Sequence, residues 1–270
     1  MKIYAYGIID SKDTIDETIF GLEGASVYNI SYRDIGMVVS ELRQKLQEIT
    51  DANVLKHEEV IEALMMKSTV LPIRFSTIFY TKEDLLSTML FCYQDFIDNL
   101  ARLRNKVEFG IKVIWPADTI KQRVVDVYHK TKHNVSISTE SPAKTFVKEK
   151  FQEHIIEKEF QEEADRCIQV VDDYFNRIAC EKKLKRLQTE SLLLNASYLV
   201  DKDRQNEFKQ AFEQLKNAPS DLKFLFSGPW PCYNFINLNK KPSSVDYFNT
   251  EDMLNTLLAQ QGFAQERNSV

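Results

Sequence analysis

The run of residues that follows Pro142 constrains this fold more than any other feature, because residues 143–187 contain neither proline nor glycine. Both residues interrupt helices, so their absence over such a length favours helical structure. Ser141 and Pro142 supply the N-cap and first-turn signals of a helix start. Apolar residues then recur at alternating spacings of four and three, as in a coiled-coil seam: Phe160, Ala164, Cys167, Val171, Tyr174 and Ile178. The pattern predicts one long helix, or two helices broken near residues 180–183.

The residues before this run predict an N-terminal α+β domain over residues 1–116. Strands are expected at 3–9, 27–31, 35–40 and 106–115, and helices at 52–66, with Asp51 as N-cap, and at 85–103. Thr81 and Asp84 form a capping-box-like start for the second helix. Pro116 ends the last strand. Strands at both ends of the region, with two amphipathic helices between them, predict an antiparallel sheet with helices on one face.

Residues 117–270 predict a second α+β domain that contains the long helical segment. After that segment the patterns indicate a strand at 191–200, a helix at 203–217 and a strand at 222–226. A β-α-β order after a helix is typical of a rearranged ferredoxin-like domain. A short final helix is expected around Met253, Leu254, Leu257 and Leu258, followed by a polar tail. A chain of 270 residues is long for one core and sufficient for two domains.

Charge and cysteine usage exclude several classes of protein. The net charge of −5 leaves no overall basic surface for nucleic acid. No apolar run approaches the roughly 20 residues that span a bilayer, so no membrane segment is expected. The 4 cysteines are scattered without close pairing, so no disulfide framework, metal site or cofactor is predicted. The sequence also lacks the phosphate-binding and nucleophile motifs of common enzymes. These observations favour a cytoplasmic protein.

Two segments, residues 70–85 and 224–236, carry the strongest functional signal. In each segment, aromatic and apolar residues surround Pro or Gly. Ordinary core strands avoid Pro and Gly. Within them, VLPIRFST at 70–77 resembles the VLPxRFGT motif of the gas vesicle protein GvpL/GvpF family, and GPWPCYNF at 228–235 resembles its GPWPPYSF motif. Further similar segments keep the family's order: IYAYGI at 3–8, DIGMVVSEL at 34–42, HEEVIEAL at 57–64, VEFGIKVIW at 107–115 and LLNASYLVD at 193–201.

This resemblance implies a non-enzymatic accessory role in assembling the gas vesicle, a gas-filled protein shell. The implied partners are the very apolar small shell protein and other gas vesicle accessory proteins, and the implied location is the vesicle shell. Three residues depart from the motifs: Ser76 stands for the usual Gly, and Cys232 and Asn234 stand for the usual Pro and Ser. F-like and L-like members share these motifs, so the resemblance does not separate them.

The two motifs supply six candidate partner-binding residues: Pro72, Arg74, Phe75, Trp230, Tyr233 and Phe235. Arg74 fits either a structural ion pair beside the core or a contact with a partner. Prolines on both sides of Trp230 restrict its backbone, which holds the aromatic side chains in place at low entropic cost. Such rigid aromatics suit a partner-facing patch, and they equally suit a plug for the second domain or the seam between domains.

An alternative class of function is a small-molecule-binding or enzymatic module, because ferredoxin-like folds host many activities. That alternative predicts a concave pocket where His57, Arg74 or Tyr233 converges with carboxylates. His57 lies on the apolar side of its helix, where a lone histidine is usually a hydrogen-bonded core residue. The HExxH metal motif fails here, because Glu62 occupies the position of its second histidine.

Overall fold

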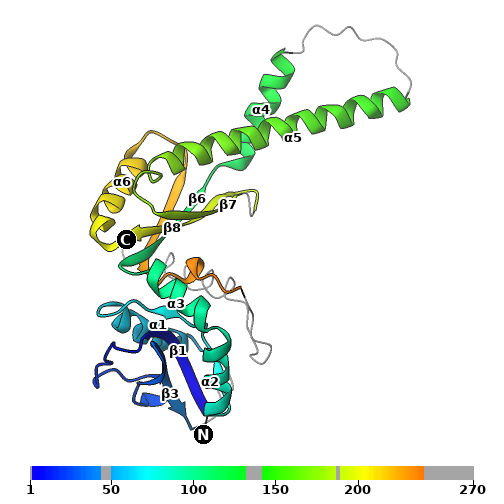
Figure 1. The fold of residues 1–270 in the computed structure, drawn as a ribbon. Helices are drawn as coiled ribbons and strands as arrows, with labels where there is room; N and C mark the ends of the chain where they lie inside the picture. Colours follow the sequence, from blue (N-terminus) through cyan, green and yellow to red (C-terminus); the bar gives the residue numbers. More distant parts are fainter. Residues whose placement is uncertain (1, 44–49, 132–141, 187–188, 240–270) are drawn as a thin grey trace. The chain divides into compact units, whose positions relative to one another are not determined.

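A computed structural model describes residues 2–43, 50–131, 142–186 and 189–239 (Figure 1). The predicted N-cap Ser141 and the predicted final helix near residues 253–258 lie outside these ranges. The described parts combine helices with two β-sheets, so the α+β class is confirmed.

The chain forms two compact units, and their limits differ from the predicted domains. One unit contains Met1–Phe109 and Ser227–Val270, and the other contains Gly110–Phe226. The prediction placed a single boundary after residue 116 and assigned the whole C-terminal part to the second domain. The difference arises because residues 232–239 hydrogen-bond to residues 95–108, far earlier in the chain.

The first unit is built on an antiparallel sheet with the strand order β2-β3-β1-β4, and β5 also pairs with β1. Its strands are β1 (Lys2–Asp10), β2 (Tyr28–Tyr32), β3 (Ile35–Leu42), β4 (Leu71–Pro72) and β5 (Ile78–Phe79). A turn joins β2 to β3, and Arg33 in this turn has a left-handed φ of 53°. The β1–β3 register shifts between Ala5 and Gly7. Tyr4 and Tyr6 are two residues apart in β1 and belong to the same core cluster.

Three helices belong to this unit: α1 (Asp51–Met65), α2 (Lys82–Phe91) and α3 (Tyr93–Arg102). The N-cap of α1 is Thr50 rather than Asp51, because the Thr50 hydroxyl accepts from the Asn53 amide. Thr81 caps α2 as predicted, accepting from the Asp84 amide at 3.0 Å. The single helix expected over residues 85–103 is two helices, since Cys92 departs from helical geometry between them.

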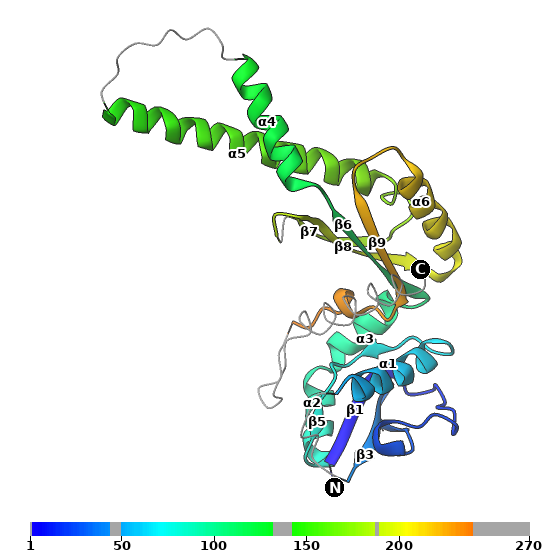
Figure 2. The same cartoon turned by 180° about the vertical axis from the view of Figure 1, so that it is seen from behind.

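Helices cover both faces of the first sheet, whereas the sequence predicted one. Residues 4–6 and 8–9 of β1, and residues 35–40 of β3, are buried without alternation, which requires cover on both sides. Tyr4 and Tyr6 belong to the core cluster that α1 completes. Helix α3 approaches β1, β3 and β4. In Figure 2, α1 lies in front of β1. In Figure 1, which views the molecule from the opposite side, α2 and α3 lie nearer the viewer.

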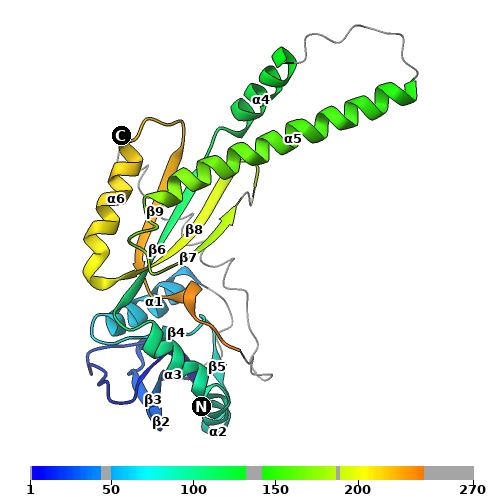
Figure 3. The same cartoon turned by 45° about the horizontal axis from the view of Figure 1, so that its top comes forward.

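The second sheet has the strand order β7-β8-β6-β9. Its strands are β6 (Lys106–Ile114), β7 (Glu181–Arg186), β8 (Leu192–Asp201) and β9 (Lys223–Trp230), and the helices are α4 (Ala117–Thr131), α5 (Pro142–Asp173) and α6 (Gln205–Asn217). Along the chain these elements run β-α-α-β-β-α-β. Ring contacts join Phe175 to Tyr198 and Phe208, so α5 and α6 pack on the same face of the sheet (Figure 3).

The long helix is confirmed, but it ends at Asp173, and residues 181–186 form the edge strand β7 rather than more helix. Four lysine and arginine side chains on β7 protect this edge from pairing with other chains. The buried stripe of α5 also differs from the predicted seam, since Cys167 and Tyr174 lie half-buried beside it. The stripe and the turn after the helix contain Phe160, Ala164, Ile168, Val171, Phe175 and Ile178. A sheet and α4 together present a broader surface than one partner helix, so the stripe is wider than a coiled-coil seam.

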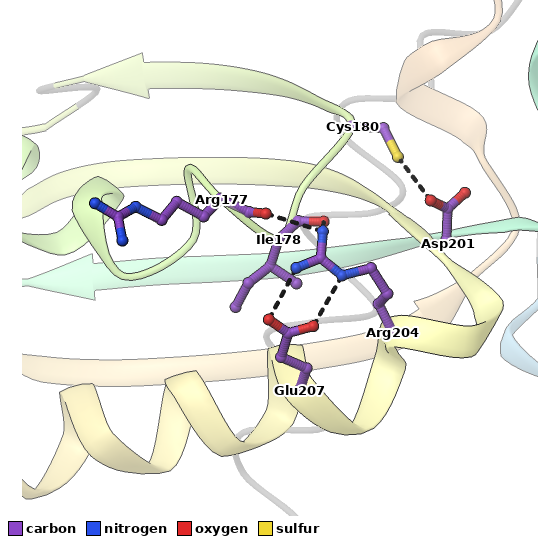
Figure 4. Close-up of polar contacts among 6 residues, drawn as sticks. All are labelled: Arg177, Ile178, Cys180, Asp201, Arg204 and Glu207. Atoms are coloured by element: carbon purple, nitrogen blue, oxygen red, sulfur yellow. Dashed lines mark hydrogen bonds and ion pairs between the residues drawn. The ribbon is translucent and has the colours of Figure 1, made fainter.

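One arginine joins the end of α5 to the start of α6 (Figure 4). Arg204 donates to the carbonyl oxygens of Arg177 and Ile178 at 2.9 and 3.1 Å, where the chain has left the helix. Its other nitrogens form a two-point pair with Glu207 at 2.8 Å. Nearby, the Cys180 thiol approaches the Asp201 carboxylate at 3.4 Å. These Arg204 hydrogen bonds stabilise the turn that leads the chain from α5 into β7.

Candidate partner-binding segment

The two motifs that are distant in sequence meet at helix α1 of the first unit. Phe75 is buried in the core cluster, with ring centroids 5.6 Å from His57 and 6.2 Å from Tyr4. Tyr233 packs against the same cluster and donates from its hydroxyl to Glu58 Oε1 at 2.7 Å. His57 and Glu58 are neighbours on α1, so one turn of this helix connects both motifs.

The first motif forms a tight loop against β1. Pro72 pairs with Gly7, and the Ile73 amide donates to the Tyr6 carbonyl at 2.8 Å. The Arg74 carbonyl accepts from the Thr77 hydroxyl at 2.8 Å. Ser76 has a φ of 68°, in the left-handed region that favours glycine. This backbone geometry explains why glycine is usual at the position, and Ser76 adopts it here with its amide donating to the Tyr4 hydroxyl at 3.0 Å.

His57 is fully buried and hydrogen-bonded through both ring nitrogens. Its Nε2 lies 3.0 Å from the Ile73 carbonyl oxygen, which only accepts, so Nε2 carries the proton. Nδ1 therefore accepts from the Tyr4 hydroxyl at 2.9 Å. Burial lowers the pKa of His57 to about 4, and its hydrogen bond to Ile73 offsets part of that shift. A neutral, enclosed histidine of this kind supports the core and is not accessible to a substrate.

Glu58 and Tyr233 form a hydrogen-bonded pair at the edge of the core. Burial raises the pKa of Glu58 to about 7, the Tyr233 hydrogen bond acts to lower it, and nearby Glu62 acts to raise it. Burial is the main cause that raises the pKa of Tyr233, and the negative charge of Glu58 raises this pKa further. The tyrosine is thus a neutral donor that fastens the second motif to α1.

The second motif begins within β9 (Lys223–Trp230) and has unusual backbone geometry at Gly228. Gly228 precedes Pro229 through a cis peptide bond and has a φ of 109°. A Cβ at Gly228 would lie 2.7 Å from the Glu108 carbonyl oxygen, so only glycine fits this close approach. Trp230 is half-buried, and its indole nitrogen is buried without a hydrogen-bond partner among the described residues. Phe235 is only 1% exposed and fills the first unit, whereas the plug considered from the sequence would have closed the second domain or the seam between domains.

Sequence reasoning missed the polar residues that hold this segment. Glu108 is 2% exposed and accepts from the backbone and side-chain nitrogens of Asn234. Asp95, Asn99 and Arg102 bind residues 235–239 from helix α3. No pattern in the sequence marked Glu108 as buried, because charged residues in strands and helices are usually solvated. The one signal in the sequence was Asn234, which stands where the family motif has Ser and which bonds to Glu108 in the structure.

Among the residues that the structure describes, no group of three or more His, Cys, Asp or Glu side chains is arranged to hold a metal ion. Within the same ranges, no helix combines the length and the apolar character that crossing a bilayer requires.

Comparison with known proteins decides the family. The profile of the family described as gas vesicle synthesis protein GvpL/GvpF matches residues 2–237, nearly the whole chain. The chain belongs to the GvpL/GvpF family. Gas vesicle protein F of Haloferax mediterranei is 25% identical over 243 residues, covering 88% of this chain and 94% of that protein. The corresponding protein of Dolichospermum flosaquae is 25% identical over 246 residues, covering 88% and 99%.

An L-type relative and two solved structures are also similar to this GvpL/GvpF member. Gas vesicle protein L of a Streptomyces species is 23% identical over 209 residues, covering 73% of this chain and 74% of that protein. The crystal structure of GvpF from Anabaena sp. superposes with a TM-score of 0.73 at 22% identity, covering 92% of this chain and 99% of that one. GvpF from Microcystis aeruginosa gives 0.75 at 20% identity, covering 88% and 99%. These two structures share the fold.

Proposed function

We propose that this protein is a non-enzymatic accessory factor of gas vesicle assembly that binds the apolar shell subunit and other accessory proteins at the vesicle shell. The family match over residues 2–237 carries this proposal, because the relatives it groups are gas vesicle proteins. We also infer that the second unit is ferredoxin-like. The succession of strands and helices along that unit, with β6 as the first strand and β9 as the last, supports this inference.

Burial narrows which of the six candidate residues can contact a partner. Pro72, Phe75 and Phe235 are buried, so their side chains support the fold. Arg74, Trp230 and Tyr233 are half-buried and keep part of their surface. A role in partner contact is therefore proposed for these three, with Trp230 foremost because truncating a large aromatic side chain often costs the most binding energy.

A second apolar surface lies near the start of helix α5. Phe146, Val147 and Phe151 are exposed by 60%, 66% and 59%, although soluble proteins usually bury such side chains. They fall on consecutive turns of one helix and form an apolar group among charged residues. An apolar shell subunit is a partner whose chemistry suits this group, because both surfaces lose contact with water on binding.

The test is a pull-down of the small shell protein with purified wild type and three variants that circular dichroism shows to be folded. Trp230→Ala removes the half-buried indole, and Phe146→Ser with Val147→Ser makes the start of α5 polar. Val170→Ser is the matched control, because Val170 is also on α5 and is 60% exposed. We expect wild type and the control to retain the shell protein, and at least one of the other two variants to lose it.

Each result has a distinct meaning. Loss in Trp230→Ala alone places the contact at residues 228–235, and loss in the α5 variant alone places it on that helix. Equal binding by all four proteins moves the contact to another surface of the chain. If wild type fails to retain the shell protein, the shell-binding proposal is wrong. The same assay with the other accessory proteins then tests the remaining part.

A further inference from the structure

The edge strand β2 of the first sheet lacks the features that usually keep an edge from pairing. It lies at the end of the strand order β2-β3-β1-β4, so β3 is its one neighbour among the described strands. Its sequence, YNISY, contains no charged residue and no proline. Natural edge strands are usually protected by charged side chains, prolines or bulges. Both edges of the second sheet follow that rule, because β7 carries four lysine and arginine residues and β9 contains Lys223 and Pro229.

The main-chain groups of Asn29 and Ser31 point away from β3. A two-residue turn joins Tyr32 to Ile35, so these two residues form the first hydrogen-bonded pair of the hairpin. Hydrogen-bonded pairs with β3 then recur at every second residue of β2. The amides and carbonyls of Asn29 and Ser31, which lie between those pairs, therefore face the open side of the strand.

The side chains of β2 leave this open side uncovered. The Asn29 carboxamide lies over β3, since a Cβ at Gly36 would be only 2.1 Å from Asn29 Oδ1. Ser31 is small and exposed. Just before the strand, the Val27 amide donates to the Ile19 carbonyl oxygen at 3.4 Å, so the open edge begins with β2 itself.

The residues of β2 also form a nearly palindromic pattern, in which Ile30 is flanked on each side by a polar residue and then by a tyrosine. If a second copy runs antiparallel with the two Ile30 residues opposite each other, Tyr28 faces Tyr32 and Asn29 faces Ser31. The outward main-chain groups of Asn29 and Ser31 then form hydrogen-bonded pairs that exchange both N–H···O bonds. Aromatic pairs and polar pairs across strands stabilise a sheet, and no like charges of β2 meet.

One member of each aromatic pair is already fixed in position. The Tyr32 ring lies 5.9 Å from the Tyr93 ring, and the Arg33 guanidinium lies 5.3 Å from the Tyr32 ring. The Tyr93 hydroxyl donates to Asp34 Oδ2 at 2.7 Å, which holds this group together. Tyr28 is 38% exposed and can bury more of its ring against a partner. A side chain that is ordered before binding loses little entropy on association.

We propose that β2 is a self-association edge, at which two copies of this chain pair their β2 strands antiparallel about a two-fold axis at Ile30. The axis makes the contact isologous, because each copy contributes the same strand. A pair of 5-residue strands is smaller than a standard interface of about 1,600 Å², so the dimer is weak, with a Kd of about 10–100 μM. This self-association requires no other protein and is independent of the proposed binding to the shell subunit.

The test is sedimentation equilibrium of the full chain in reducing buffer, from about 5 to about 500 μM. The mass of wild type should rise with concentration from 31.5 kDa toward twice that value. Ser31→Lys places a charge on the outer edge and should weaken the dimer about tenfold or more. Ser87→Lys is the matched control, because Ser87 is exposed on α2 and the charge change is the same, and its Kd should stay within about twofold of wild type.

A charge exchange at the same position tests the two-fold arrangement. In the paired strands the two residue-31 side chains are diagonal neighbours, about 7–8 Å apart, so long charged side chains there interact. Ser31→Glu alone should also weaken the dimer, because the two carboxylates repel each other. An equal mixture of Ser31→Lys and Ser31→Glu should dimerise about tenfold more tightly than either variant alone.

Three results would overturn the proposal. One is a wild-type chain that stays monomeric up to about 500 μM. Another is equal dimerisation of wild type and Ser31→Lys, shown by circular dichroism to be folded, because the dimer would then use a different surface. The third is a mixture of the two charged variants that dimerises no better than each alone.

A second variant replaces the charged ones if they do not fold. Ser31→Pro removes the outward amide donor without adding charge, and edge strands tolerate proline where the N–H faces solvent. It should weaken the dimer about tenfold or more, because each copy loses one main-chain donor to its partner. Unchanged dimerisation of the folded Ser31→Pro protein counts equally against pairing at β2.

Discussion

Replacing Glu58 by glutamine should reveal a pH dependence of folding that the wild-type chain conceals. Glutamine keeps an oxygen that accepts from Tyr233 but cannot titrate. In the folded chain the pKa of Glu58 rises from 4.5 to about 7, so its contribution to stability is present below pH 4.5 and is lost as the pH rises to about 7. His57 shifts oppositely, from 6.5 to about 4, so its contribution grows with pH between about 4 and 6.5.

The two contributions nearly cancel between pH 5 and 6. Each group differs by most of one proton between the folded and unfolded states in this window, and one proton corresponds to about 1.4 kcal/mol per pH unit. Each therefore changes the free energy of unfolding by about 1.1 kcal/mol from pH 5 to 6, with opposite signs. Relative to wild type, Glu58→Gln should gain about 1.1 kcal/mol over this interval, and His57→Gln should lose about the same amount.

The assay is urea unfolding at pH 5.0, 5.5 and 6.0, followed by the fluorescence of Trp230. A Trp115→Phe background leaves Trp230 as the single tryptophan, and Trp230 belongs to the first unit. Comparing each variant with its parent removes the contribution of all other titrating groups. Equal pH dependence in Glu58→Gln and its parent would show that Glu58 keeps its ordinary pKa on folding, and the reasoning from burial would be wrong.

Three further substitutions test the packing, each by urea unfolding. Phe75→Ala should cost about 3–5 kcal/mol, because it leaves a cavity beside Tyr4 in the core, and a loss below about 1 kcal/mol would contradict this burial. Ser76→Gly should add about 1 kcal/mol by relieving a left-handed backbone, and a loss would mean that the serine side chain contributes more than the strain. Asp172→Ala should cost about 3 kcal/mol, because buried Asp172 binds Lys182 and Tyr198, and an unchanged stability would refute that pairing.

Local patterns allowed much of the fold to be predicted. The proline-free and glycine-free run indicated α5, and the Thr81 capping signal indicated the start of α2. These elements depend on neighbours within a few residues, so the local sequence is enough to predict them. The local patterns failed at residues 181–186, where helix was expected and pairing with a distant strand decided the structure. Residues 181–186 are highly charged yet pair as an edge strand with β8, and Lys182 and Arg186 also form ion pairs with carboxylates on α5.

The candidate site was predicted only in part. The sequence singled out Phe75 and Tyr233, and the structure places both at the core cluster beside α1. It gave no indication that Glu58 accepts from Tyr233, because those residues are 175 positions apart. A hydrogen bond across such a distance leaves no periodic trace in a single sequence.

By itself, then, the amino-acid sequence determined the α+β class, the long helix and the family membership, because each depends on short-range periodicity or on contiguous motifs. Only the tertiary structure decided that residues 232–239 return to the first unit, that helices cover both faces of its sheet, and that Glu108 is buried. Asn234 and Glu108 lie 126 positions apart, and Asn239 and Asp95 lie 144 apart. Such contacts form only when the folded chain brings distant segments together and removes their polar groups from water, which makes each missing partner costly.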